Sequence, residues 1–112
     1  MLNNDLTSKY EWKLLGSVAS QQSIDFPTDY AEVQICIVDP NEVYLSYVYN
    51  FSKPFIQSIG TTTRYFGEGY YKKNTDYQSC QMGMNMYGCY LLSMAAVNVE
   101  YSHDCVLTVY YR

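Results

Sequence analysis

Hydrophobic and polar residues alternate along most of this chain, and the longer period of an amphipathic helix is hard to find. In the run AEVQICIV, Val33, Ile35 and Ile37 fall on one face of an extended strand. The run EVYLSYVYN alternates in the same way, and DPNE separates the two runs with the turn chemistry of proline and asparagine. The pattern predicts a β-hairpin over residues 31–50.

Residues 61–71 predict a further strand that contains two glycines. Gly67 and Gly69 alternate there with larger side chains. Glycine inside a strand often marks a bulge or a close approach of another main chain. The sequence KKNTD at 72–76 follows and predicts a turn.

Residues 77–92 alternate again and predict one long strand, with breaks only near Asn85 and Gly88. This strand places Met82, Met84 and Met86 on one side. Methionine serves both at adaptable contact surfaces and in ordinary cores. We expect core or subunit packing here, because an exposed apolar stripe promotes aggregation.

The end of the chain is less uniform. Residues 93–104 fit a strand, a short loop with a helical turn, or both. The last eight residues, CVLTVYYR, alternate clearly and place Cys105, Leu107, Val109 and Tyr111 on one face. A chain end that forms a strand is held by sheet pairing, and we expect Arg112 to find a carboxylate or carbonyl nearby.

Together these elements predict the all-β class. Several short strands at regular spacing are typical of antiparallel sheets packed as a sandwich or barrel. The chain has 112 residues, which is the size of a single domain with one core. We predict one antiparallel β-sandwich, jelly-roll-like, over residues 10–112, with residues 1–9 as a lead-in segment.

The charge balance argues against two classes of partner. The formal net charge is −4, whereas nucleic-acid binding calls for clustered lysines and arginines that displace counterions. The start of the chain lacks a charged segment followed by an apolar one, and no apolar run is long enough to span a bilayer. We therefore expect synthesis in the cytoplasm, no membrane insertion and no nucleic-acid partner.

The four cysteines have irregular spacings and follow no secretion signal. We interpret Cys36, Cys80, Cys89 and Cys105 as reduced and mostly buried thiols, with two disulfides as the alternative. The single histidine, His103, is interpreted as a turn residue rather than as a catalytic group or metal ligand. A zinc site calls for paired ligands, which the sequence lacks.

Nothing in the residues supports an enzyme. The 11 carboxylates are scattered, and no two stand out as an acid and base pair. The glycines at 67 and 69 lack the lysine and the longer spacing of a phosphate-binding loop. We expect no catalytic residues, no metal and no cofactor.

The 14 tyrosines are the unusual feature of the composition. Tyrosine offers a large, rigid contact surface at low entropic cost, which suits recognition and stacking on a sugar ring. The candidate ligand-binding residues lie in or next to the predicted turn at 72–76, with the tyrosines flanking it, and ordinary sheet-surface tyrosines are the alternative. These candidates are Tyr65, Tyr70, Tyr71, Lys72, Asn74 and Tyr77.

The two ends of the chain resemble a known class of domain. The motifs are LTSKYEWKLLGSV, QSIDFPTDYAEVQICI and the terminal VLTVYYR. They are similar to the small C-terminal β-domains of bacteriophage tail-fibre and baseplate receptor-binding proteins. The similarity rests on short motifs at both ends and does not extend to residues 50–100. The matching residues are Trp12, Leu15, Gly16, Ile24, Pro27, Glu32, Tyr110, Tyr111 and Arg112.

This resemblance implies an antiparallel sandwich at the tip of a virion appendage, usually in a homotrimer. Such domains are non-enzymatic and attach to a host cell-surface saccharide or protein. Two other classes are weighed against it. A small phage-encoded inhibitor that sequesters a host protein or ligand inside the cell fits the size and acidity of the chain. A hydrolase that trims surface polysaccharide is the third and least supported class.

Overall fold

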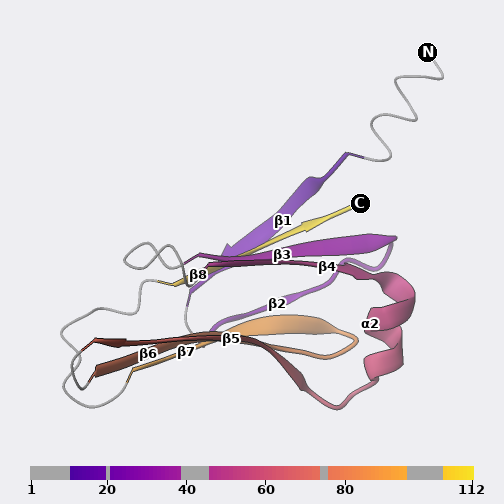
Figure 1. The fold of residues 1–112 in the computed structure, drawn as a ribbon. Coiled ribbons are helices and arrows are strands. Elements are labelled where there is room, and N and C mark those ends of the chain that lie inside the picture. Colours follow the sequence, from indigo (N-terminus) through magenta and orange to yellow (C-terminus); the bar gives the residue numbers. More distant parts are fainter. Residues whose placement is uncertain (1–10, 20, 39–45, 74–75, 96–104) are drawn as a thin grey trace.

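The computed structural model describes residues 11–19, 21–38, 46–73, 76–95 and 105–112. In this part of the chain, eight strands form two four-stranded antiparallel sheets (Figure 1). The first sheet contains, in spatial order, β1 (Lys13–Val18), β8 (Val106–Tyr111), β3 (Glu32–Val38) and β4 (Tyr47–Ser52). The second contains β2 (Ser23–Asp25), β7 (Gly88–Ala95), β6 (Asp76–Met84) and β5 (Arg64–Lys73).

The two sheets face each other and confirm the predicted all-β sandwich. The chain passes between the sheets four times within the described elements: from β1 to β2, from β2 to β3, from β4 to β5 and from β7 to β8. The other connections are hairpins within one sheet. The predicted hairpin is among them, because β3 pairs with β4 with Ile35 opposite Tyr49. Its predicted turn at DPNE lies outside the described residues.

The core lies between the sheets and consists of the residues that the alternation placed inward. Val33, Ile35 and Ile37 of β3 are completely buried, as are Leu107 and Val109 of β8. The second sheet supplies the opposite wall of the core with Met82, Met84, Cys89 and Leu91. Burial of such side chains contributes about 1.5–3 kcal/mol each.

A layer of aromatic rings closes the edge of the sandwich between β4 and β5. Tyr49 and Phe51 of β4 are stacked with centroids 5.9 Å apart, and Phe51 stacks on Phe55 at 5.4 Å. Phe66 of β5 meets Phe51 at 5.0 Å in a tilted arrangement. These rings cover the core at β4 and β5, which are outermost in their sheets among the strands that the structure describes.

The alternation did not predict the helix α2 (Lys53–Ile59), which connects the sheets at this edge (Figure 1). Its sequence signal is a capping residue followed by proline. Ser52 caps the helix by accepting a hydrogen bond from the Phe55 amide, and Pro54 lies in the first turn. Ile56 is the buried contact of the helix with the core. The predicted turn at Gly60 is confirmed as the end of this helix.

The prediction of one strand over residues 77–92 is wrong, because this run forms the hairpin of β6 and β7. Asn85 turns the chain by accepting hydrogen bonds from the amides of Tyr87 and Gly88 through Oδ1. Met82 and Met84 are buried in the core, as expected, whereas Met86 lies in the turn. The predicted bulge in β5 is confirmed, since the register with β6 shifts between Phe66 and Gly69.

The interpretation of all cysteines as reduced thiols is also wrong. Cys105 is disulfide-bonded to a cysteine whose side chain lies outside those described. Cys36 and Cys89 are free thiols. Burial raises the pKa of Cys89 to about 12, so this thiol stays protonated and unreactive at neutral pH.

The remaining expectations concern segments of which less is described. His103 and the region 96–104 lie outside the described residues, as does the lead-in segment. Within the part of the chain that is described, no helix is long and apolar enough to cross a membrane.

Gly88 provides a test of the close pairing between β2 and β7. A β-carbon at Gly88 would lie 2.3 Å from the main-chain oxygen of Ile24, whereas one at Gly16 would meet only the end of the Ile24 side chain, at 2.8 Å. The Ile24 side chain can rotate away, but its main chain is held by the pairing of β2 with β7. We expect Gly88→Ala to lower the free energy of unfolding by about 2 kcal/mol or more, and Gly16→Ala to cost clearly less. Urea denaturation checks this, and equal losses would contradict it.

Candidate ligand-binding site

The outer face of the second sheet carries two tyrosines on either side of a glycine. In the sheet register, Tyr65 of β5 lies opposite Gly83 of β6, Gly83 lies opposite Tyr90 of β7, and Tyr90 lies opposite Ser23 of β2. Residues that are directly opposite in adjacent antiparallel strands share a face of the sheet. One row of four residues therefore crosses the sheet, with the missing side chain of Gly83 between the tyrosines.

The Tyr90 ring fills the space above Gly83. A β-carbon on Gly83 would lie 2.4 Å from Cε1 of Tyr90, which is too close for any other residue without displacing the ring. Tyr65 stands perpendicular to Tyr90, with centroids 6.5 Å apart and an interplanar angle of 90°. The Tyr90 hydroxyl donates to the Tyr65 hydroxyl at 3.2 Å. We call Tyr65, Gly83 and Tyr90 the tyrosine platform, with Tyr90 as its floor and Tyr65 as its wall.

The hydrogen bond between the two hydroxyls affects ionisation. The pKa of Tyr90 is raised above its ordinary value of 10.0, chiefly by the hydrogen bond to Tyr65. This bond requires the proton on Tyr90 and thus favours the neutral phenol. The Tyr90 hydroxyl is therefore neutral at physiological pH, and a phenol hydroxyl can act as donor or acceptor for a polar ligand.

A hollow of about 210 Å³ adjoins the platform. It extends from Gly83 and Tyr90 to the next row of the sheet, where Gly88 lies opposite Asp25. The polar groups around it are the hydroxyls of Ser23 and Thr63, the amide of Asn85 and the carboxylate of Asp25. The volume is below the roughly 300–1,000 Å³ of pockets that take drug-sized molecules. It suits a single small polar ring.

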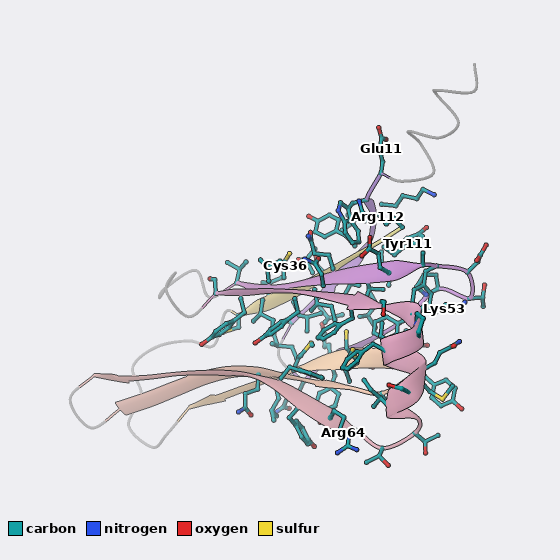
Figure 2. The ribbon with its side chains drawn as sticks, turned by 45° about the vertical axis from the view of Figure 1, so that its right-hand side comes forward. Glu11, Cys36, Lys53, Arg64, Tyr111 and Arg112 are labelled. Atoms are coloured by element: carbon teal, nitrogen blue, oxygen red, sulfur yellow. The ribbon has the colours of Figure 1, made fainter. Side chains whose placement is uncertain are left out.

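A second hollow, of about 540 Å³, lies beside Tyr65, which is 61% exposed. It contains Arg64 and Thr63 with three residues of the helix α2. The two hollows share Thr63. In Figure 2, Arg64 lies on the side of the second sheet, away from the first.

The structure places the predicted binding residues at two ends of one hairpin. Tyr65 lies on the platform, while Lys72 pairs with Tyr77 near the far end of the β5–β6 hairpin. Seven residues of strand separate Tyr65 from Lys72, which corresponds to roughly 23 Å at the usual rise. Tyr70 and Tyr71 lie between them in β5, opposite Ser79 and Gln78. The side chains of Lys72, Tyr77, Tyr70 and Tyr71 lie outside what the structure describes, as does the whole of Asn74.

Sequence reasoning missed Tyr90, the closest aromatic partner of Tyr65. The missing step was the turn at Asn85, because only a hairpin brings residue 90 opposite residue 83. The available signal was the sequence NMYG, since asparagine and glycine three positions apart favour a tight turn. A predicted turn at Asn85 would have placed Tyr90 close to Tyr65.

A separate cluster lies where β8 ends, next to β1 and β3. The guanidinium of Arg112 forms an ion pair with Glu32 and lies 4.2 Å from the centre of the Trp12 ring. The main-chain oxygen of Arg112 accepts from the amides of Ala31 and Glu32 at 2.7 and 3.0 Å. The expected carboxylate partner of Arg112 is thus Glu32. Figure 2 shows Arg112 and Tyr111 beside the start of β1.

Among the described residues, no three histidine, cysteine or acidic side chains are close enough together to hold a metal ion. The platform offers two phenol hydroxyls, and the adjoining hollow adds the carboxylate of Asp25 and the hydroxyls of Ser23 and Thr63. Comparison of the chain with known protein families, with curated proteins and with solved structures found no match.

The tyrosine pair makes a direct prediction about ionisation. Replacing Tyr65 with phenylalanine removes the hydroxyl that accepts from Tyr90. We expect Tyr65→Phe to lower the pKa of Tyr90 towards its ordinary value of 10.0, because the neutral phenol loses its stabilising partner. An NMR titration of tyrosine labelled with ¹³C at Cζ measures this directly. An unchanged pKa of Tyr90 would show that the hydroxyls do not interact in solution.

Proposed function

We propose that this protein is a non-enzymatic receptor-binding module of a bacteriophage tail fibre or baseplate, and that its tyrosine platform binds a saccharide of the host cell surface. The observation that carries the proposal is the floor and wall formed by Tyr90 and Tyr65 at 90°. An aromatic floor packs against the apolar face of a sugar ring, while polar groups at the rim bond to its hydroxyls. Ser23 and Asp25 supply such groups at the edge of the hollow.

Two further features support a role at a virion tip. The residues that resemble receptor-binding β-domains include Trp12, Glu32 and the terminal YYR, which lie in or next to β1, β3 and β8, three neighbouring strands of the first sheet. The disulfide of Cys105 fits exposure to an oxidising environment, since such bonds are rare in the reducing cytoplasm. The same disulfide weighs against an inhibitor that acts inside the host cell.

The proposal includes a homotrimer as the functional assembly. The outer face of the first sheet offers apolar surface that subunit contacts would cover. Val48 is 62% exposed there, and Val38 lies opposite Val106 on the neighbouring strand, each more than one-third exposed. The tyrosine platform lies on the other sheet, so this arrangement would leave it open to the host surface.

Binding to bacterial polysaccharides tests the proposed site. The probe is the labelled protein, applied to an array of purified capsular and lipopolysaccharide O-chain polysaccharides. We expect Tyr90→Ala to weaken binding about tenfold or more, since stacking contacts contribute about 1–3 kcal/mol. We expect Gly83→Ala to weaken binding as well, because its methyl group displaces the Tyr90 ring.

The matched control for these variants is Tyr110→Ala. Tyr110 is a partly buried tyrosine of β8 in the first sheet, where it lies opposite Leu14 and Gln34. It borders neither of the two hollows at the platform nor any other hollow of the described surface. Because Tyr110 shares the outer face of the first sheet with the proposed subunit contacts, the variants are compared at the same assembly mass by light scattering, and Tyr110→Ala should then bind as the wild type does. Equal losses in all three variants would show that the platform is not the site, and no binding by the wild type would refute a saccharide receptor.

The assembly is tested by the absolute mass in solution. Light scattering on a sizing column, at several concentrations, should give three times the chain mass of 13.0 kDa. The value should not change with dilution if the trimer is stable. A monomer at all concentrations would contradict the homotrimer and leave the monovalent platform as the binding unit.

A further inference from the structure

The platform hollow is the first of three that follow one another around the end of the sandwich. It shares Tyr87 with a hollow of about 220 Å³, which in turn shares Tyr30 with a hollow of about 660 Å³. The chain between β2 and β3 passes them in order, because residues 23–25 line the first, 26–28 the second and 29–32 the third. A stretch of ten residues, at most about 35 Å long, therefore borders all three hollows.

Contacts between neighbouring segments hold this border in place. The amide of Phe26 donates to the Tyr87 oxygen at 2.9 Å, and the amide of Lys53 donates to the Ala31 oxygen at 2.8 Å. The amide of Met86 donates to the Gly60 oxygen at 2.9 Å, which ties the β6–β7 turn to the end of the helix α2. The hollows thus belong to one fixed surface made of three connected segments.

Aromatic rings recur along this surface. Tyr87, between the first two hollows, is 60% exposed. Tyr30, between the second and third, has the Lys53 ammonium 5.0 Å from its ring centre. Tyr111 borders the third hollow, with the Lys13 ammonium 5.9 Å from its ring centre. Each hollow therefore has at least one tyrosine ring at its edge.

Basic residues gather here although the chain is acidic. The chain has seven lysines and arginines, and four of them line these hollows or the one beside Tyr65. They are Lys13, Lys53, Arg64 and Arg112. Three carboxylates line the same hollows, namely Asp25, Asp29 and Glu32. The lining has a net charge of +1, on a chain whose formal net charge is −4.

Within the described part of the chain, three of these cations have no carboxylate partner. Arg112 is paired with Glu32, whereas Lys13 and Lys53 face tyrosine rings and the guanidinium of Arg64 makes no hydrogen bond or ion pair with a described residue. Figure 2 shows Arg64, Lys53 and Arg112 in succession from the second sheet, past the start of the helix, to the first sheet. Positive charge is thus distributed along the whole path.

We propose that the three hollows, the tyrosine platform and the hollow that contains Arg64 form one groove that binds an extended, carboxylate-bearing polysaccharide chain, with about one sugar unit in each hollow. This inference rests on the proposed function and specifies its ligand. The cations of the groove alternate with carboxylates of the protein. A polysaccharide with acidic groups on only some of its sugar units can place these groups at the cations and neutral units at the carboxylates. A nucleic acid matches less well, because its phosphate at every unit would meet Asp25, Asp29 and Glu32.

Chain length and charge are tested with defined probes. The probes are oligomers of galacturonate, of glucuronate–N-acetylglucosamine and of sialic acid, from one repeating unit upwards, with their methyl esters as neutral controls. Affinities are measured by calorimetry with the full chain. We expect affinity for at least one acidic series to rise with each unit until the groove is filled. We also expect it to fall with added salt, and the methyl ester to bind more weakly.

The charge contribution is tested with Arg64→Gln. This variant should lower the affinity for the acidic oligomer about two- to fivefold, the size of an exposed ion pair, and lower the affinity for its methyl ester less. The matched control is Asn50→Asp, which changes the net charge equally on the outer face of the first sheet. Its acceptor oxygen for Gln34 is retained. Equal effects of both variants would show that only overall charge matters and would overturn the groove.

The outcomes separate this inference from the function on which it rests. Binding that is already complete with one sugar unit overturns the groove, but leaves a saccharide-binding platform. Binding of neutral chains in preference to acidic ones overturns the charge assignment alone. Stronger binding of single-stranded DNA than of any polysaccharide, or no binding of any polysaccharide, overturns both the groove and the proposed function.

Discussion

The position of the last strand within the first sheet is the constraint on which the rest of the sandwich depends. β8 pairs with β1 on one side and with β3 on the other, and among the described strands it is the sole partner of β1. The buried side chains of Leu107 and Val109 complete the inner face of this sheet. Arg112 fixes the end of the strand through Glu32 and the Trp12 ring. β1 is therefore connected to β3 and β4 in this sheet only through β8, the last strand of the chain.

The same arrangement leaves the second sheet free to carry a site. Its strands β5, β6 and β7 form consecutive hairpins, and the registers of these hairpins bring Tyr65, Gly83 and Tyr90 into one row. The absent side chain of Gly83 gives the Tyr90 ring its place, and Tyr90 in turn positions Tyr65 through the hydroxyl contact. The site is thus a consequence of strand register, and the groove proposed around it follows the connections at one end of the same sheets.

Much of the fold was predictable because alternation reports directly which side chains face a core. It placed Val33, Ile35 and Ile37 inward and identified the β3–β4 hairpin. It failed at α2, where a helix of seven residues is too short to show its own period and only Ser52 and Pro54 indicate it. It also failed at Asn85, where alternation continues through a turn. The site depended on that turn, so Tyr65 was found without Tyr90.

The most direct test of the account is a map of where a saccharide binds. The measurement is a ¹⁵N–¹H NMR spectrum of the assigned protein, titrated with oligosaccharides released by mild hydrolysis from bacterial capsule and O-chain polysaccharides. If the platform and its groove bind the saccharide, the amide signals of Gly83, Tyr87 and Tyr90 shift. The amides of Gln34, Asn50 and Thr108, on the outer face of the first sheet, change little. Shifts confined to the first sheet, or no shifts with any fraction, would contradict the account.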